Sequence, residues 1–191
     1  MGTYVVGITG ASGSIYGVRL IEELLKSGNE VNIIITDTGK KVLKYETEYT
    51  VELLARHLEE YGSRVKFQDI YDLFASTASG SFKIDGMIIL PCSMATLGEI
   101  AHGISKNLLG RSADVCLKER RKLIIVPRET PLSTIHLRNM LSLSESGAVI
   151  LPAMPGFYHK PENIEDMIDF VIGKVMDSLG IENKLFKRWV N

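Results

Sequence analysis

Short apolar runs alternate with longer amphipathic segments along the whole chain. Most of the apolar runs are continuous and do not alternate with polar residues, which is typical of strands buried on both faces of a parallel sheet. The pattern predicts strands at Tyr4–Thr9, Glu30–Thr36, Gly86–Leu90, Leu123–Val126 and Ala148–Leu151.

The amphipathic segments between these runs predict helices. They lie at Ile15–Ser27, Val51–Tyr61, Met94–Ile104, Leu108–Arg121, Leu132–Ser144 and Asn163–Leu179. Alternating strands and helices indicate one doubly wound α/β domain over residues 1–191, because no repeat or linker divides the chain. The segment Asp69–Phe82, rich in Ser, Thr and Gly, is the most loop-like.

The loops after the predicted strands hold the candidate chemistry. In an open parallel sheet, ligands bind at the carboxyl ends of the strands. Three of the five loops open with proline, and together they carry many hydroxyls, an Arg-Glu pair and a tyrosine. We therefore expect one binding site built from GASGS (10–14), TDTG (36–39), PCSMAT (91–96), PRETP (127–131) and PAMPGFYH (152–159).

The first two of these loops allow more than one interpretation. Backbone N–H groups of the turn at residues 10–13 can bind an anion, but a tight strand-to-helix turn would look the same. The glycine spacing is not the G-x-G-x-x-G of dinucleotide-binding domains. Asp37 after the second strand still allows a dinucleotide-binding interpretation.

Three further stretches are candidates for binding a phosphate or another anion. Ser93 can cap a helix whose first turn carries Thr96, which suits a phosphate monoester and equally an ordinary N-cap. Arg128 can hold a phosphate bidentately and Glu129 can move a proton, the alternative being a surface ion pair. Arg111 and Lys118, seven residues apart, share a helix face that is either solvated or a second anion site completed across a subunit contact.

Composition narrows the class of protein. The 191 residues carry 22 basic and 23 acidic side chains, a net charge of −1, so nothing favours nucleic acid or an anionic membrane. No apolar run reaches the ~18–20 residues that span a bilayer, and the first residues lack a secretory pattern, so we expect a cytoplasmic protein.

Two cysteines are too few for a disulfide framework and are interpreted as packing residues. The four histidines have no metal-ligand spacing, so no metal is expected, and no G-x-S-x-G supports a serine hydrolase.

The order and spacing of several motifs identify a family. They are GITGASGSIYG, the glutamate of KYETE, ASGSF, PCSMATLGEIAHGISKNLLGRSADVCLKERR, VPRETPLSTIHLRNM, GAVILPAMPGFYH and a terminal RW. Over nearly its whole length the chain resembles the UbiX-like flavin prenyltransferases, within the homo-oligomeric flavin-containing Cys decarboxylases. The resemblance implies a three-layer Rossmann-like (flavodoxin-like) fold and a metal-independent prenyl transfer to reduced FMN. The dimethylallyl group of dimethylallyl monophosphate would join flavin N5 and C6, giving prenylated FMN for UbiD-like decarboxylases.

The resemblance also assigns residues. FMN would be bound by Gly10, Ala11, Ser12, Thr36, Ser93, Met94, Ala95, Thr96 and Arg128. The prenyl phosphate would be met by Arg128, Tyr158 and Lys174, and by Arg111 and Lys118 of an adjacent subunit in a homo-oligomer, typically a dodecamer. Catalysis would rest on Ser12, Glu46 and Glu129, which surround phosphate departure and proton movement, and on Lys118 and Arg128. Trp189 would wall the prenyl pocket; a terminal tryptophan is otherwise a packing anchor.

Two alternatives remain open at this point. One is an FMN-dependent decarboxylase of the same superfamily, although the chain has PCSMAT where those enzymes carry a PASANT-type motif, and it lacks their PxMNxxMW motif. The other is a non-enzymatic flavin-binding protein, which would need only one anion site. The pathway served, ubiquinone biosynthesis or aromatic-acid degradation, also stays open.

Overall fold

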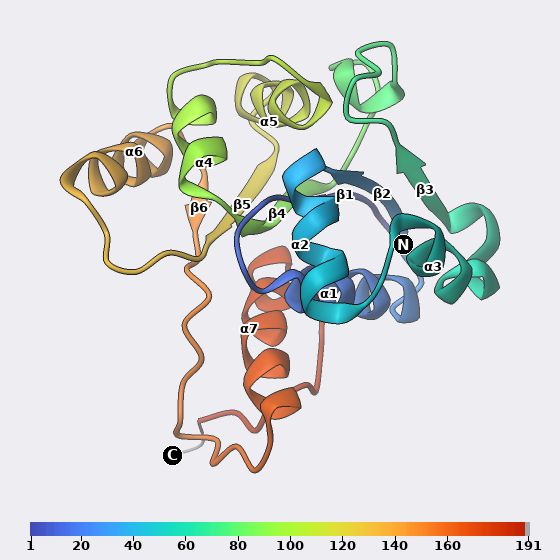
Figure 1. Ribbon diagram of the computed structural model, residues 1–191, viewed down its shortest axis with the longest axis vertical. Coiled ribbons are helices and arrows are strands. Elements are labelled where there is room, and N and C mark those ends of the chain that lie inside the picture. The colour runs from blue at the N-terminus through green and yellow to red at the C-terminus, as the bar shows by residue number, and fades with distance from the viewer. Residues whose placement is uncertain (190–191) are drawn as a thin grey trace.

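Six parallel strands form one twisted sheet in the computed structural model, which describes residues 1–189 (Figure 1). The sheet order is β3-β2-β1-β4-β5-β6. The strands are β1 (Thr3–Ile8), β2 (Glu30–Ile35), β3 (Val65–Gln68), β4 (Gly86–Cys92), β5 (Lys122–Pro127) and β6 (Val149–Ile150). The predicted doubly wound α/β fold is therefore confirmed.

All five predicted strands are present, and one strand was missed. Without β3, the remaining strands follow the order of flavodoxin-like sheets, and β3 extends that sheet by one edge strand to the 3-2-1-4-5-6 order. The sequence of β3, VKFQ, alternates apolar and polar residues and is not fully buried at any position. A short edge strand lacks the continuous apolar run that marks strands buried on both faces.

Helices cover both faces of the sheet. They are α1 (Ser14–Lys26), α2 (Asp37–Thr47), α3 (Val51–His57), α4 (Met94–Ala101), α5 (Leu108–Lys118), α6 (Thr134–Glu145) and α7 (Ile164–Leu179), with 3-10 turns at η1 (Glu59–Arg64) and η2 (Ser76–Ala78). The predicted helices agree within a few residues at most ends. Three predictions were wrong at their carboxyl ends. The helix from Met94 stops at Ala101, shortly before Gly103 at φ 66°. The helix from Val51 stops at His57 before a 3-10 segment that contains Gly62 at φ 56°, and the helix from Leu108 stops at Lys118 because Arg120 adopts φ 53°.

Helix α2 was not predicted. Only Gly39 and Leu43 are buried in its 11 residues, so its apolar face is too narrow to give a clear helical period. Thr36 caps its first turn by accepting a hydrogen bond from the Gly39 N–H at 3.1 Å. The segment after β2 is therefore a helix N-terminus, where the sequence indicated only a loop.

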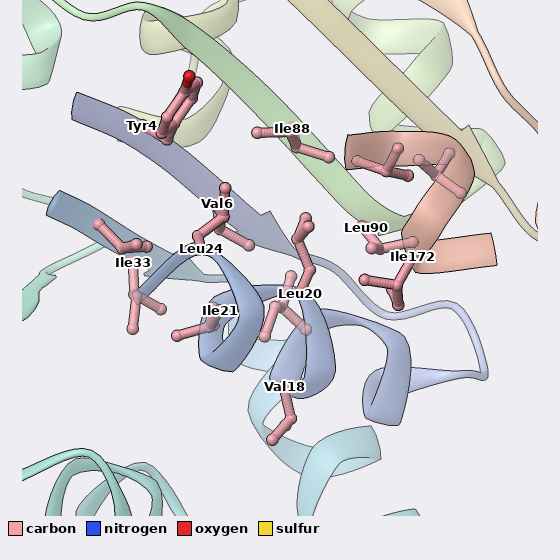
Figure 2. Packing of buried hydrophobic residues seen from close by; sticks show 14 of the residues in the cluster. Tyr4, Val6, Val18, Leu20, Ile21, Leu24, Ile33, Ile88, Leu90 and Ile172 are labelled. Carbon is pink, nitrogen blue, oxygen red and sulfur yellow. The ribbon is translucent and has the colours of Figure 1, made fainter. Parts of the chain in front are cut away.

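The core lies in two layers, one on each side of the sheet. On one side, Val6, Ile33 and Ile88 of the strands face Leu20 and Leu24 of α1 (Figure 2). Helix α7 completes this layer, while α4 and α5 cover the opposite face. Burial of these large apolar side chains supplies the main driving force for folding.

The strand order reverses between β1 and β4. The chain leaves β1 through α1 toward β2, whereas it leaves β4 through α4 and α5 toward β5. Such a switch point opens a crevice at the carboxyl edge of the sheet, where ligands bind in doubly wound domains. Within residues 1–189, no helix combines the length and apolar character needed to cross a membrane.

Candidate functional site

The turn between β1 and α1 leaves no room for side chains. A Cβ on Gly10 would lie 2.5 Å from the Thr38 methyl carbon, and Gly13 adopts φ 102°, a region that favours glycine. The turn therefore packs directly on the start of α2. Next to it, the Ser14 hydroxyl is buried and has no hydrogen-bond partner among residues 1–189.

Three helix N-termini meet at this edge of the sheet, because α1, α2 and α4 each begin just after β1, β2 and β4. Ser93 caps α4 by accepting from the Thr96 N–H at 3.3 Å, and the two hydroxyl oxygens lie 3.1 Å apart. The predicted cap is thus confirmed. Free N–H groups at helix N-termini, together with hydroxyls, form an anion-binding edge.

Thr9 is a buried residue that the sequence analysis missed. Its hydroxyl donates to the Pro91 carbonyl at 2.8 Å and accepts from the Ser93 N–H at 2.8 Å. The side chain thereby joins the end of β1 to the loop that leads into α4. The signal available in the sequence was a hydroxyl residue directly between the first apolar run and the glycine-rich turn.

Ser12, Glu46 and Arg128 come together from three separate segments. The Glu46 carboxylate accepts from the backbone N–H groups of Gly13 and Ser14 at 2.9 and 3.0 Å, and Arg128 Nε donates to the Ser12 carbonyl at 3.3 Å. Burial acts to raise the pKa of Glu46. Hydrogen bonds from the Ser12 hydroxyl and the two backbone N–H groups, with the Arg128 charge, outweigh burial and hold that pKa below its usual range. Glu46 is therefore an anion at neutral pH.

A cavity of about 470 Å³ opens beside this cluster. Arg128 and Glu129 supply its charged groups, while the Glu129 carboxylate accepts from the Thr130 N–H at 2.9 Å. Its other lining residues are Pro127, Thr130, Leu132, Met140, Pro152, Ala153 and Met154. Arg128 and Glu129 form no ion pair with each other in the described part of the chain, so the alternative of a surface pair is not realised.

Arg111 and Lys118 lie apart from that cluster. Arg111 contacts Asp114 at 2.7 Å and the Ala78 carbonyl at 3.1 Å, and Lys118 pairs with Glu119. Helix α5 runs antiparallel to the strands, so Lys118 lies toward the amino edge of the sheet, shortly before β5 begins. A single chain therefore does not bring Lys118 to the carboxyl edge of the sheet, where Ser12 and Arg128 lie.

Tyr158 and Trp189 form a third group. Their rings meet edge to face with centroids 5.5 Å apart, and Tyr158 makes a similar contact with Phe170. In Figure 1 this part of the chain runs away from the sheet, below α7. A cavity of about 250 Å³ is lined there by Tyr158, Lys187, Arg188 and Trp189, while Lys174 is exposed on α7.

The cysteines are packing residues, as predicted. Cys92 and Cys116 are free and buried. Burial raises the pKa of both thiols, that of Cys116 to about 12. His136 completes a capping box with Ser133 at the start of α6. In the part of the chain that the structure describes, no group of three or more His, Cys, Asp and Glu side chains could hold a metal ion.

Comparison with known proteins identifies the family. The model of the Flavoprotein family matches residues 2–176. The flavin prenyltransferase UbiX of Halalkalibacterium halodurans is 53% identical over 98% of this chain and 93% of its own length. The crystal structure of AnUbiX (PadA1) in complex with FMN and dimethylallyl pyrophosphate superposes with a TM-score of 0.93, at 40% identity over 100% of this chain and 98% of that one. A dodecameric FMN-dependent UbiX-like decarboxylase from Escherichia coli O157:H7 gives a TM-score of 0.92, at 42% identity over 99% and 100%. The chain therefore belongs to the Flavoprotein family and, within it, to the UbiX flavin prenyltransferases.

Proposed function

We propose that this protein is a flavin prenyltransferase that joins the dimethylallyl group of dimethylallyl monophosphate to N5 and C6 of reduced FMN. The observation that carries this proposal is the cluster of Ser12, Glu46 and Arg128 at the carboxyl edge of β1. It places a carboxylate, a hydroxyl and a fixed cation beside an anion-binding edge and a cavity.

The residues at this edge fit FMN. Small residues in the β1 turn allow a flat ring to approach the backbone, and the capped starts of α2 and α4 suit its phosphate. The proposed flavin ligands are Gly10, Ala11, Ser12, Thr36, Ser93, Met94, Ala95, Thr96 and Arg128. Bound reduced FMN would supply the nucleophilic N5 and C6 positions.

The prenyl phosphate would be bound by Arg128, Tyr158 and Lys174, with Arg111 and Lys118 of an adjacent subunit. Because one chain keeps Lys118 near the amino edge of its sheet, away from Arg128 at the carboxyl edge, this set requires a homo-oligomer. The dodecameric relative from E. coli supports the proposal of a dodecamer here. Trp189 would provide an apolar wall of the prenyl pocket.

The cations drive the departure of the phosphate. The allylic C–O bond breaks with its electron pair on the leaving phosphate, and the developing dianion is stabilised by arginine and lysine side chains. The proton displaced as the N5–C bond forms leaves with the phosphate. Closing the ring through C6 moves one proton from C6 to the prenyl double bond, and Glu46 and Glu129 are the proposed proton carriers.

Three further features follow from this function. Charge neutralisation by side chains lets the reaction proceed without a metal ion, so a chelator should leave the rate unchanged. Prenylated FMN would pass to a UbiD-like decarboxylase as its cofactor. We place the protein in the cytoplasm, where reduced flavin is available.

The test is an anaerobic reaction of the purified protein with reduced FMN and dimethylallyl monophosphate, followed by mass spectrometry of the extracted flavin. A flavin heavier by one five-carbon prenyl unit is expected, and parallel reactions with the pyrophosphate rank the two donors. Unmodified FMN together with carbon dioxide release from an aromatic acid would instead establish an FMN-dependent decarboxylase. Bound but unmodified FMN with neither reaction would indicate a flavin-binding protein.

A further inference from the structure

The last residues of the described chain return along α7 and are anchored at two points. The first anchor is Phe186, which is buried and packs on Phe170 with ring centroids 4.9 Å apart. A Cβ on Gly173 would lie only 2.5 Å from carbon atoms of the Phe186 ring. The absence of a side chain at residue 173 therefore lets the tail, residues 181–189, lie directly on α7.

The second anchor is an ion pair between Asp177 of α7 and Arg188 of the tail. The two guanidinium nitrogens of Arg188 contact the two carboxylate oxygens at 2.5 and 2.7 Å. The Asn183 amide also donates to Asp177, at 2.9 Å, and Arg188 lies over the Phe186 ring at 4.9 Å. A bidentate pair fixes direction as well as distance, so it orients the residue that follows.

That residue is Trp189. Although 73% exposed, it meets Tyr158 edge to face, and both rings line the 250 Å³ cavity together with Lys187 and Arg188. Because Trp189 is largely exposed, its position depends on the contacts that fix the backbone of the residues before it. The Asp177–Arg188 pair supplies that restraint one residue away.

Asp177 also stands three residues after Lys174 on the same helix. Residues three apart are neighbours on a helix surface. No ion pair of Lys174 is present among residues 1–189. As long as Arg188 occupies the Asp177 carboxylate, the Lys174 ammonium stays available to another anion.

From this geometry we propose that Arg188 and Asp177 form a latch with two effects: it places Trp189 against Tyr158, and it leaves Lys174 free to bind the prenyl phosphate. Arg188 is a positioning residue that acts through Trp189 and Lys174. The second effect rests on the function proposed above, whereas the first does not.

Fluorescence anisotropy tests the first effect, because Trp189 is the only tryptophan in the chain. The full-length protein is measured at equal flavin content as wild type, Asp177→Asn, Arg188→Ala and Arg188→Lys. Lys184→Ala, which removes another cation of the tail, is the matched control. We expect lower anisotropy in Asp177→Asn and Arg188→Ala, a smaller fall in Arg188→Lys and no change in Lys184→Ala. Anisotropy equal to wild type in both Asp177→Asn and Arg188→Ala would overturn the latch.

Steady-state kinetics test the second effect. Arg188→Ala should raise KM for dimethylallyl monophosphate by about tenfold with FMN affinity unchanged, because the freed Asp177 carboxylate pairs with Lys174. Adding Asp177→Asn to Arg188→Ala removes that competing anion and should recover part of KM, while the anisotropy stays low. A double variant with KM no better than Arg188→Ala would reject the role of Lys174.

The two proposals fail in different ways. If wild-type protein forms no prenylated flavin, the prenyltransferase proposal fails, and the anisotropy series still decides whether the latch exists. If wild type is active and Arg188→Ala keeps both its anisotropy and its KM, the latch is wrong and the proposed function stands.

Discussion

The Thr9 hydroxyl accepts a hydrogen bond from the Ser93 N–H at 2.8 Å and so links the ends of the two central strands. The same hydroxyl donates to the Pro91 carbonyl, also at 2.8 Å. Thr9 is fully buried, so its side chain is shielded from solvent. It fixes the start of α4, where the flavin phosphate is proposed to bind, relative to the β1 turn.

Thr9→Val should weaken both the fold and the flavin site. The isosteric methyl group leaves the Ser93 N–H without its partner, at a cost of about 1–3 kcal/mol. The Pro91 carbonyl loses the hydroxyl and keeps the backbone N–H of residue 9, at 3.2 Å. We expect a lower free energy of unfolding and a larger FMN dissociation constant, measured by denaturation and by flavin fluorescence titration. Thr9→Ser keeps the hydroxyl and serves as the control. A Thr9→Val protein with wild-type FMN affinity would show that this link does not position Ser93.

Glu46→Gln should make the stability of the folded protein less dependent on pH in the acidic range. Hydrogen bonds in the folded protein hold the pKa of Glu46 below its usual range. The stability this carboxylate contributes is therefore present above its ordinary pKa and lost as the pH falls through its folded value. We expect the melting temperature of Glu46→Gln to lie below that of wild type at pH 7 and to converge with it in acid.

The matched control for that series is Glu60→Gln, which alters an exposed glutamate in η1. Its melting temperature should follow wild type at every pH. A difference between Glu46→Gln and wild type that persists unchanged at low pH would mean that the carboxylate charge is not the source of the effect.

Gly17→Ala should destabilise the packing of α1 on the sheet. A Cβ at residue 17 would lie 2.7 Å from the Leu90 carbonyl oxygen and 2.8 Å from the Ile8 side chain. Overpacking of this kind costs about 1–3 kcal/mol. Chemical denaturation of Gly17→Ala measures the loss. Gly28→Ala does not serve as a control because Gly28 adopts φ 81°, so Ser27→Ala at the exposed end of α1 is the better comparison.

Lys118→Ala and Arg128→Ala should separate the two anion sites. Arg128 contacts the Ser12 carbonyl beside the proposed flavin site, whereas Lys118 of the same chain lies toward the opposite, amino edge of the sheet. We expect Lys118→Ala to keep FMN bound and to lower turnover, on the order of 10²-fold, by removing a cation from the leaving phosphate. Arg128→Ala should weaken FMN binding and also lower turnover.

Equilibrium dialysis with FMN and turnover assays distinguish these variants. Lys66→Ala, an exposed lysine of β3, controls for a general loss of positive charge. Loss of FMN from Lys118→Ala would argue against a prenyl-phosphate site separate from the flavin site.

Features that depend on residues close together in the sequence, such as helix caps and buried strands, were predictable. Ser93 caps α4 as its place before a helical segment indicated. Strands β1, β2, β4 and β5 are apolar because they are buried on both faces, whereas β6 is partly exposed. Motif order added the family, and with it the candidate residues. By contrast, β3 and α2 bury too few side chains to leave a periodic trace in the sequence.

The sequence by itself determined the alternation of strands and helices, the loops that carry hydroxyls and charges, and the family. Only the tertiary structure decided which of these side chains meet. Thr9 and Ser93 are far apart in sequence, as are Glu46 and the turn at Gly13 and Ser14, and Asp177 and Arg188 pair only because the tail folds back on α7. Such contacts depend on strand order and on the direction of each connection. They arise from packing across the sheet, which local sequence patterns do not encode.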